Sequence, residues 1–224
     1  MQYNFEKAID LSHILENSMP IYPGDPKVSL EPAKTVETDG VNLTKITMGS
    51  HTGTHLDAPR HFIDGGEKIS DIPVQKFMGA ALVLDFSSKK IGSGIEKEDL
   101  RRELDEGRMN DGDFVLLYTG SSDHWGDPEF SKNYTYLAPS GAEYLVSKKA
   151  RAVGIDFLSI EKYGEASAPT HKILLSNGVF IIESLSDKLK LFIGKRIFFI
   201  ALPLKIGFLG DGAMTRAVAV PIEE

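Results

Sequence analysis

The most informative stretch of this 224-residue chain reads His51-Thr52-Gly53-Thr54-His55-Leu56-Asp57-Ala58-Pro59-Arg60-His61-Phe62. It contains three of the chain's six histidines. Its segment Thr52-Gly53-Thr54 is a poor helix interior, because two β-branched residues flank a glycine. We therefore expect an extended or bent backbone. Side chains of an extended chain alternate between two faces, so the odd-numbered histidines and Asp57 would point the same way.

The spacing of these side chains suits a metal ion only if the segment bends. In a fully extended chain the α-carbons of His51 and His55 would lie about 13 Å apart, which is too far for sharing one ion. Gly53 is the place where the chain can bend and bring the two imidazoles together. His55 and Asp57 are near neighbours already. We interpret the cluster as a metal site; the alternative is a polar, hydrogen-bonded loop whose histidines are incidental.

The remaining ligands must also be histidines or carboxylates, because the chain has no cysteine. This absence excludes disulfides, thiolate metal sites and cysteine nucleophiles. Glu183 ends the apolar run 179–182 and needs a partner there, since an unpaired buried carboxylate is costly; the alternative partners are water or a lysine. His171 stands at the start of an expected short helix, where the helix dipole favours a neutral imidazole. Taken alone, it would be a capping or surface histidine.

Short β-rich runs recur along the chain, and several are near-continuously apolar, as expected for strands buried on both faces. They lie at residues 41–48, 80–86, 114–118, 152–157, 179–182, 196–202 and 215–220. Helices are expected at 96–106, at 140–149 after Pro139 with a capping serine, and at 171–176 between a capping Thr170 and Asn177-Gly178. Strands and helices do not alternate strictly. This predicts an α/β fold, a compact domain with a barrel-like mixed sheet and helices packed outside.

The organisation of the chain predicts one domain over residues 1–224, because no linker, repeat or low-complexity tract interrupts it. The first thirty residues are rich in turn formers, including Pro23-Gly24-Asp25-Pro26. We expect residues 1–30 to form an N-terminal arm on the surface of this domain.

Charge and hydropathy exclude several kinds of partner. The net charge of −7 speaks against a nucleic-acid groove, which needs a basic surface. No uninterrupted apolar run approaches the ~20 residues needed to cross a bilayer. The first residues lack the pattern of a signal peptide. We therefore expect a cytoplasmic protein that acts on a small molecule, with no nucleic-acid or membrane partner.

The stretch from His51 to Phe62 resembles the signature of the cyclase-like metal-dependent hydrolases, a family that includes bacterial kynurenine formamidase and isatin hydrolase. The resemblance covers nearly the whole chain. It extends to Asp10-Leu11-Ser12, Tyr22-Pro23-Gly24-Asp25, His171-Lys172-Ile173-Leu174-Leu175, Ile182-Glu183, Pro203-Leu204-Lys205, Asp211-Gly212 and Arg216-Ala217-Val218. It implies a swivelling β/β/α-like version of the expected α/β fold, assembled as a homodimer or homotetramer.

The resemblance also implies a ligand set. His51, His55 and Asp57 would hold one divalent ion, and His171 and Glu183 a second. Asp57 and Glu183 would bridge the two ions. We expect two Zn²⁺ per chain, or Mn²⁺ in their place, because imidazole and carboxylate ligands accept both metals.

Two further residues receive roles from the resemblance. His61 matches the catalytic histidine of the family. Tyr22 stands where the formamidases typically carry a tryptophan that contacts the substrate.

The expected activity is the hydrolysis of an amide bond by an arylformamidase, which converts N-formylkynurenine to kynurenine and formate. A metal-bound water would lose its proton near neutral pH, giving the attacking hydroxide. His61 would carry protons between this nucleophile and the leaving amine as acid and base. The alternatives are hydrolysis of a cyclic amide such as isatin, a cyclase or dehydratase reaction on another small metabolite, and a non-enzymatic, metal-stabilised ligand-binding module.

Overall fold

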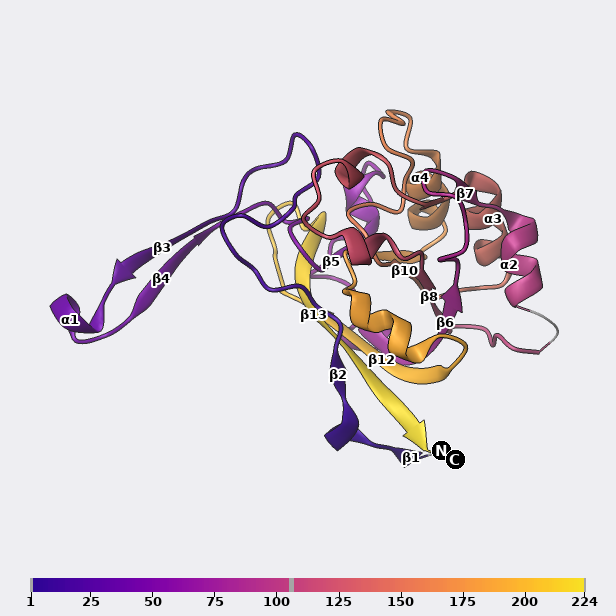
Figure 1. Cartoon of the computed structure of the whole chain (residues 1–224), viewed down its shortest axis with the longest axis horizontal. Helices are drawn as coiled ribbons and strands as arrows, with labels where there is room; N and C mark the ends of the chain where they lie inside the picture. Colours follow the sequence, from indigo (N-terminus) through magenta and orange to yellow (C-terminus); the bar gives the residue numbers. More distant parts are fainter. Residues whose placement is uncertain (1, 105–106, 224) are drawn as a thin grey trace.

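The computed structural model describes residues 2–104 and 107–223. Within them, strands close into a barrel in the order β13, β12, β6, β8, β10, β11, β5 and back to β13 (Figure 1). Their bounds are β5 His55–Asp57, β6 Met78–Asp85, β8 Phe114–Tyr118, β10 Ala152–Ile155, β11 Phe180–Glu183, β12 Arg196–Pro203 and β13 Gly212–Glu223. The α/β class with a barrel-like mixed sheet is therefore confirmed.

The barrel has a parallel half and an antiparallel half. Strands β6, β8, β10 and β11 run parallel to one another, whereas β12, β13 and β5 are antiparallel to both of their neighbours in the barrel. The strands alternate their side chains between two cores, as the pleat requires. In β8, Phe114 and Leu116 belong to the core inside the barrel, and Val115 and Leu117 to the core outside it. Burial on both faces explains the continuous apolar runs.

Helices cover one side of the barrel: α2 (Lys97–Glu103), α3 (Pro139–Ser147) and α4 (Pro169–Ser176) (Figure 1). The outer core joins the strands to these helices through Leu100, Leu145 and Leu174. The three expected helices are thus present, except that residues 105–106 of the expected 96–106 helix lie outside the described residues.

The expected capping residues of two helices were wrong. Helix α4 has Ala168 as its N-cap, and the hydroxyl of Thr170 donates to the carbonyl oxygen of Leu137 at 2.9 Å instead. Helix α3 has Ala138 as its N-cap, and the hydroxyl of Ser140 bonds to Glu96. In both cases a proline at the first helical position starts the helix one or two residues early, since its fixed φ suits that position.

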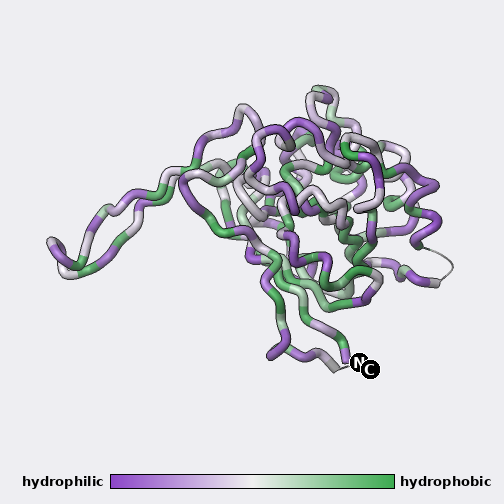
Figure 2. Tube along the Cα trace, viewed as in Figure 1, coloured by the Kyte–Doolittle hydropathy of each residue, from purple (hydrophilic) through white to green (hydrophobic). Residues whose placement is uncertain are grey.

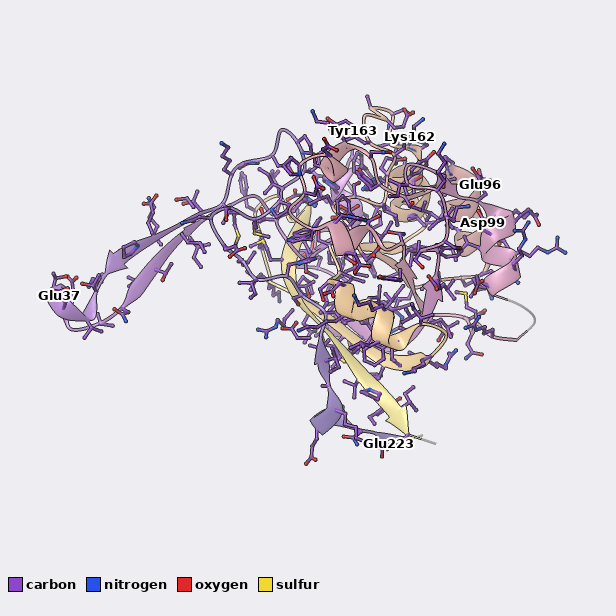
Figure 3. All side chains as sticks on the ribbon, viewed as in Figure 1. Glu37, Glu96, Asp99, Lys162, Tyr163 and Glu223 are labelled. Atoms are coloured by element: carbon purple, nitrogen blue, oxygen red, sulfur yellow. The ribbon has the colours of Figure 1, made fainter. Side chains whose placement is uncertain are left out.

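A hairpin of residues 29–47 projects from the barrel (Figure 1). It consists of β3 (Ser29–Lys34), α1 (Val36–Asp39) and β4 (Leu43–Thr47). The run 41–48 therefore does contain a strand, but this strand lies outside the barrel with both faces exposed. Figure 3 labels Glu37 at the tip of the hairpin, well away from the other elements.

Smaller elements complete the fold. Strands β1 (Gln2–Tyr3) and β2 (Ile9–Asp10) both pair with β13, which places the two ends of the chain side by side (Figure 1). Strands β7 (Gly94–Ile95) and β9 (Tyr136–Leu137) form a parallel pair. Short 3₁₀ helices are Phe5–Lys7, Pro59–His61, Val74–Phe77, Ser121–His124, Phe130–Lys132 and Asp187–Phe192. Among the described residues, no helix is long and apolar enough to cross a membrane.

Candidate metal centre

The pairing of β5 with β11 builds the centre of the site. Glu183 lies directly opposite His55, and Asp57 lies opposite Ile181, so these side chains share one face of the sheet. Leu56, between the two β5 ligand candidates, points into the inner core. The polar side chains therefore lie outside the barrel, and α4 supplies His171 to the same place.

Gly53 provides the bend that the sequence requires. Its φ is +62°, a left-handed conformation that favours glycine. The carbonyl oxygen of Gly53 then lies 2.7 Å from Nδ1 of His55. The bend brings the ring of His51 edge-on to the ring of His55, with 5.0 Å between centroids.

The structure brings together all five residues of the expected ligand set. Asp57 belongs to two groups whose donor atoms lie within 4.8 Å of one another: the first contains His51 and His55, the second His171 and Glu183. Their assignment as ligands stays a prediction, which the geometry below supports.

Each of the two carboxylates divides its oxygens between two histidines. Asp57 places Oδ1 at 3.3 Å from His55 Nε2 and Oδ2 at 3.7 Å from His171 Nε2. Glu183 places Oε2 at 3.5 Å from His55 Nε2 and Oε1 at 3.3 Å from His171 Nε2. Two carboxylates that each face both imidazoles have the arrangement of ligands that bridge a pair of cations.

The donor atoms fit cations better than they fit one another. The Gly53 carbonyl can only accept, so His55 carries a hydrogen on Nδ1, and its Nε2, which faces the carboxylate oxygens, is the nitrogen that a cation could bind in place of a proton. His55 Nε2 and Asp57 Oδ2 are buried and have no hydrogen-bond partner among the described residues. Buried polar atoms normally have one. A divalent cation between these atoms would satisfy them.

Two acidic residues outside this ligand set lie within hydrogen-bond distance of a ring nitrogen of His171 and of His51. Glu161 Oε2 lies 3.2 Å from His171 Nδ1 and also accepts from the backbone N–H of His171. Asp211 Oδ2 lies 3.0 Å from His51 Nε2, while His51 Nδ1 faces Asp57 Oδ1 at 2.8 Å. Such outer partners fix the tautomer and the orientation of a ligand histidine.

The sequence did not identify these outer partners. Asp211 lies 160 positions from His51, and the pairing of β13 with β5 brings them together, with Gly212 opposite Asp57. A β-carbon on Gly212 would lie 2.6 Å from Cε1 of His51, so this glycine makes room for the imidazole. The only available signal was the dipeptide Asp211-Gly212; Glu161 had none.

The electrostatics of the cluster favour added positive charge. Burial by itself would lower the histidine pKa values, but Asp57 and Glu183 outweigh it and raise the pKa of His55 to about 10. Burial is similarly outweighed at His171, where Glu161 and Glu183 raise the pKa to about 10. Despite burial, the neighbouring histidines lower the pKa of Glu183 to about 2. The carboxylates thus stay ionised and attract protons or cations.

His61 has the opposite electrostatic character. It ends the 3₁₀ helix Pro59–His61, and its ring stacks on His51 with 3.8 Å between centroids. Burial lowers the pKa of His61 to about 4, and Asp57 only partly offsets this. The imidazole is therefore neutral at pH 7 and has a ring nitrogen able to accept a proton.

A cavity of about 320 Å³ opens onto the cluster and onto His61. Tyr22 and Asp25 reach it from a tight turn in which the N–H of Asp25 donates to the carbonyl oxygen of Tyr22 at 3.1 Å. Pro23 and Gly24 occupy the two central positions of this turn, and the φ of Gly24 is +107°. The other lining residues are His51, His55, His61, Phe62, Leu158, Ser159, Glu161, Glu165, Ala166, Ala168, His171 and Glu183.

A buried set of imidazoles and shared carboxylates beside a cavity is the kind of donor set that holds divalent ions in metal-dependent hydrolases, and here a neutral histidine lies at its edge. Residues 9–162 match the model of the family described as "Putative cyclase", and the chain belongs to that family. The resemblance noted in the sequence is therefore confirmed.

Named relatives are similar over almost their full length. A kynurenine formamidase from Bacillus cereus (strain ATCC 14579) is 34% identical over 216 residues, which cover 96% of this chain and 97% of the relative. A kynurenine formamidase from Bacillus anthracis is 33% identical over 218 residues, covering 96% and 98%.

Solved structures agree with this assignment. A potential metal-dependent hydrolase with cyclase activity superposes with a TM-score of 0.79 at 33% identity, over 97% of this chain and 99% of the other. An isatin hydrolase bound to the product analogue thioisatinate superposes with a TM-score of 0.86 at 25% identity, over 97% and 93%.

Proposed function

We propose that the protein is a metal-dependent hydrolase of a non-peptide carbon–nitrogen bond, and that it hydrolyses an aryl formamide, N-formylkynurenine, to kynurenine and formate. The observation that carries the proposal is the sharing of Asp57 and Glu183 between His55 and His171 beside a cavity. The near full-length similarity to kynurenine formamidases supports the choice of substrate.

The proposed metal centre holds two ions. His51, His55 and Asp57 would bind the first, and His171 and Glu183 the second. Zinc or manganese suits these nitrogen and oxygen donors. When bound, such ions supply Lewis acidity, which acidifies an attacking water and polarises the carbonyl.

His61 moves the proton in this mechanism. Its neutral imidazole accepts a proton from the attacking water, whose oxygen forms a bond to the formyl carbon. The carbon–nitrogen bond then breaks, and its electron pair stays on the aryl nitrogen. His61 returns the proton to this nitrogen, so that the amine leaves uncharged and His61 is neutral again.

The cavity walls suit an aromatic substrate. Tyr22, Phe62 and Leu158 give it an apolar surface, and the ring of Tyr22 packs against Tyr163 with 5.9 Å between centroids. The lining described above also contains Asp25 and Glu165 but no lysine or arginine. This charge favours an ammonium group on the substrate, and the amino-acid end of N-formylkynurenine carries one together with a carboxylate.

A second candidate substrate is isatin, a cyclic aryl amide. The TM-score of 0.86 with an isatin hydrolase is the observation that favours it. Both substrates require the same ions and the same proton carrier, so the two differ only in the fit of the cavity.

Chelation tests the proposal directly. The metal content of the purified protein is measured, and hydrolysis of N-formylkynurenine and of isatin is followed before chelation, after it, and after addition of Zn²⁺ or Mn²⁺. We expect about two ions per chain and chelator-sensitive hydrolysis of the formamide. Hydrolysis of isatin but not of the formamide would identify isatin as the better candidate substrate. Full activity in the metal-free protein would overturn the mechanism.

Three further sequence predictions concern the domain organisation, the oligomeric state and the location of the protein. We propose a single domain over residues 1–224 with residues 1–30 as its N-terminal arm, which the pairing of β1 and β2 with the last strand supports. We also propose a homodimer or homotetramer, since the hairpin of residues 29–47 is exposed. The cytoplasmic location stays a prediction.

A further inference from the structure

The cavity beside the candidate metal centre has a buried floor and an exposed rim. His55 and Glu183 form part of the floor and are buried, whereas Asp25 and Glu165 also line the cavity but are exposed. Its volume of about 320 Å³ is at the lower end of the ~300–1,000 Å³ typical of ligand sites. A substrate whose formamide reaches the floor therefore places its other end at the rim.

The carboxylate of Asp25 has no partner in the protein. In the part of the chain that the structure describes, no hydrogen bond or ion pair reaches it. Partial burial raises the pKa of Asp25, and the positive charge of His51 and His55 only partly offsets this. The backbone of Asp25 is fixed by its bond to the carbonyl oxygen of Tyr22. A carboxylate that is partly buried and unpaired is stabilised by a cation.

Glu165 supplies a second carboxylate to the rim. The N–H and the hydroxyl of Ser167 donate to its Oε1 at 3.2 and 2.6 Å, and these bonds lower the pKa of Glu165. Lys162 lowers this pKa further but does not line the cavity. Figure 3 labels Lys162 and Tyr163 where the loop of residues 162–168 projects, and Figure 2 shows this loop without the deep green of the barrel strands. Glu165 is therefore an ionised group on a hydrophilic loop.

The two acidic segments meet at an aromatic side chain. The N–H of Gly164 donates to the hydroxyl of Tyr22, and the ring of Tyr22 lies 5.9 Å from that of Tyr163, measured between centroids. Asp25 follows Tyr22 in the same tight turn, and Glu165 follows Gly164 in the loop. Both carboxylates therefore belong to the same end of the cavity, where Tyr22 offers a face to an aryl ring.

A resident metal ion does not explain the unpaired carboxylate. Among the described residues, three groups of histidines and acidic residues have donor atoms close enough together to share an ion, and Asp25 belongs to none of them. The lining of the cavity also contains no lysine or arginine that could turn toward Asp25. The missing cation must therefore come from a ligand.

We propose that Asp25 and Glu165 form a subsite for the ammonium group of an amino acid, and that Asp25 is the residue that selects substrates bearing this group. The inference rests on the proposed function, because it assumes that the formamide occupies the floor. Asp25 contributes more than Glu165, since Glu165 already accepts two hydrogen bonds from Ser167. The carboxylate of the same amino acid finds no cation in the lining and points toward water.

Two substrates that differ only in the ammonium group test the proposal. They are N-formylkynurenine and its deamino analogue, 4-(2-formamidophenyl)-4-oxobutanoate. We expect the metal-loaded wild-type protein to favour N-formylkynurenine by about tenfold in kcat/KM, because each exposed charge pair contributes a few-fold. The preference should lie mainly in KM, since the ammonium group is remote from the bond that breaks.

Three variants locate the source of this preference. Asp25→Asn should reduce it to about two- to threefold, and Glu165→Gln should reduce it to about fivefold. Asp64→Asn is the matched control, because it removes the same charge from an exposed carboxylate outside the cavity, 3.8 Å from Arg60. The control should keep the wild-type preference.

Binding of the products gives a readout that does not depend on turnover. Calorimetry should show that the wild-type protein binds L-kynurenine about tenfold more tightly than its deamino analogue, and that Asp25→Asn loses most of this difference. Elemental analysis should find the wild-type metal content in all three variants. Loss of an ion from Asp25→Asn would make Asp25 a metal ligand and would contradict the proposal.

The outcomes separate this inference from the proposed function. Equal kcat/KM for the two formamides in the wild-type protein would keep the hydrolase but exclude the ammonium subsite. An undiminished preference in Asp25→Asn would assign the recognition to another residue. Hydrolysis of neither formamide would contradict the proposed function, and the inference would fail with it.

Discussion

Folded proteins usually bury apolar side chains and expose charged ones. The candidate metal centre and the hairpin of residues 29–47 each depart from this rule, in different ways. The centre buries charged groups, with His55, Asp57 and Glu183 each at most 5% exposed. The hairpin exposes apolar groups, with Ile46 and Leu43 more than half exposed. Buried charge and exposed apolar surface are both unfavourable when unpaired. The comparison teaches that the two regions differ in what they lack: the buried carboxylates of the centre favour cations, whereas the apolar side chains of the hairpin are left exposed.

The largest expected effect comes from removing the carboxylate that both ligand groups share. Asp57→Ala should lose both ions, because Asp57 belongs to each group. Loss of Lewis acidity that is worth several kcal/mol should reduce turnover on the order of 10³-fold or more. Elemental analysis and single-substrate kinetics measure the two effects. Retention of one tightly bound ion would show that the groups bind independently.

The next effect separates proton transfer from metal binding. His61→Ala should lower kcat by about 10²–10⁴-fold, the usual contribution of a positioned acid–base group. Its metal content should stay at the wild-type value, because His55, Asp57, His171 and Glu183 all remain. If the variant instead loses an ion, His61 is a ligand, and the proton carrier must be sought elsewhere in the cavity.

A smaller effect is expected at the outer partner of His51. Asp211→Ala removes the carboxylate 3.0 Å from His51 Nε2 and should weaken metal binding by about 10–100-fold. Competition with a chelator of known affinity measures this. Ser50→Ala is the control, since Ser50 only donates a hydrogen bond to the same carboxylate. Equal affinity in Asp211→Ala and wild type would mean that Asp57 and the stacking on His61 orient His51 without Asp211.

The smallest effect compares a glycine of the centre with one of the hairpin. Gly53→Ala places a β-carbon at φ +62° and 3.0 Å from Cε of Met19, which should lower the free energy of unfolding by about 1–2 kcal/mol. Gly40→Ala has a similar φ of +73° but open space around it, in an element that does not pack on the barrel. The free energy of unfolding, measured with urea, should therefore fall less for Gly40→Ala than for Gly53→Ala. The metal content of Gly40→Ala should not change.

The sequence predicted the parts of the site that lie close together along the chain or carry a distinct chemical pattern. His51, His55, Asp57 and His61 fall within eleven positions, and the bend they need could be assigned to Gly53. Glu161 and Asp211 could not be found in this way, because pairing and packing between distant segments place them. Asp25 was part of a quoted turn, yet nothing in that turn indicated which side chains would reach a cavity.

The sequence was sufficient to predict a mixed, barrel-like sheet, but it did not indicate which strand closes the barrel. The strand that closes the barrel, β5, has only three residues, and two of them are polar. Such a segment has neither the length nor the apolar pattern of a buried strand. Conversely, the run 41–48 has a strand-like composition but lies in the projecting hairpin, because composition does not specify which sheet a strand joins.

One feature of the chain path links the two regions. Only Met48-Gly49-Ser50 separates the last residue of β4 from His51. Whatever fixes the hairpin also restricts the segment that carries the first imidazole, so a contact that fixes the hairpin and the uptake of ions are coupled equilibria. Coupling of this kind is reciprocal. A contact that fixes the hairpin would therefore tighten the binding of ions, and bound ions would in turn favour that contact.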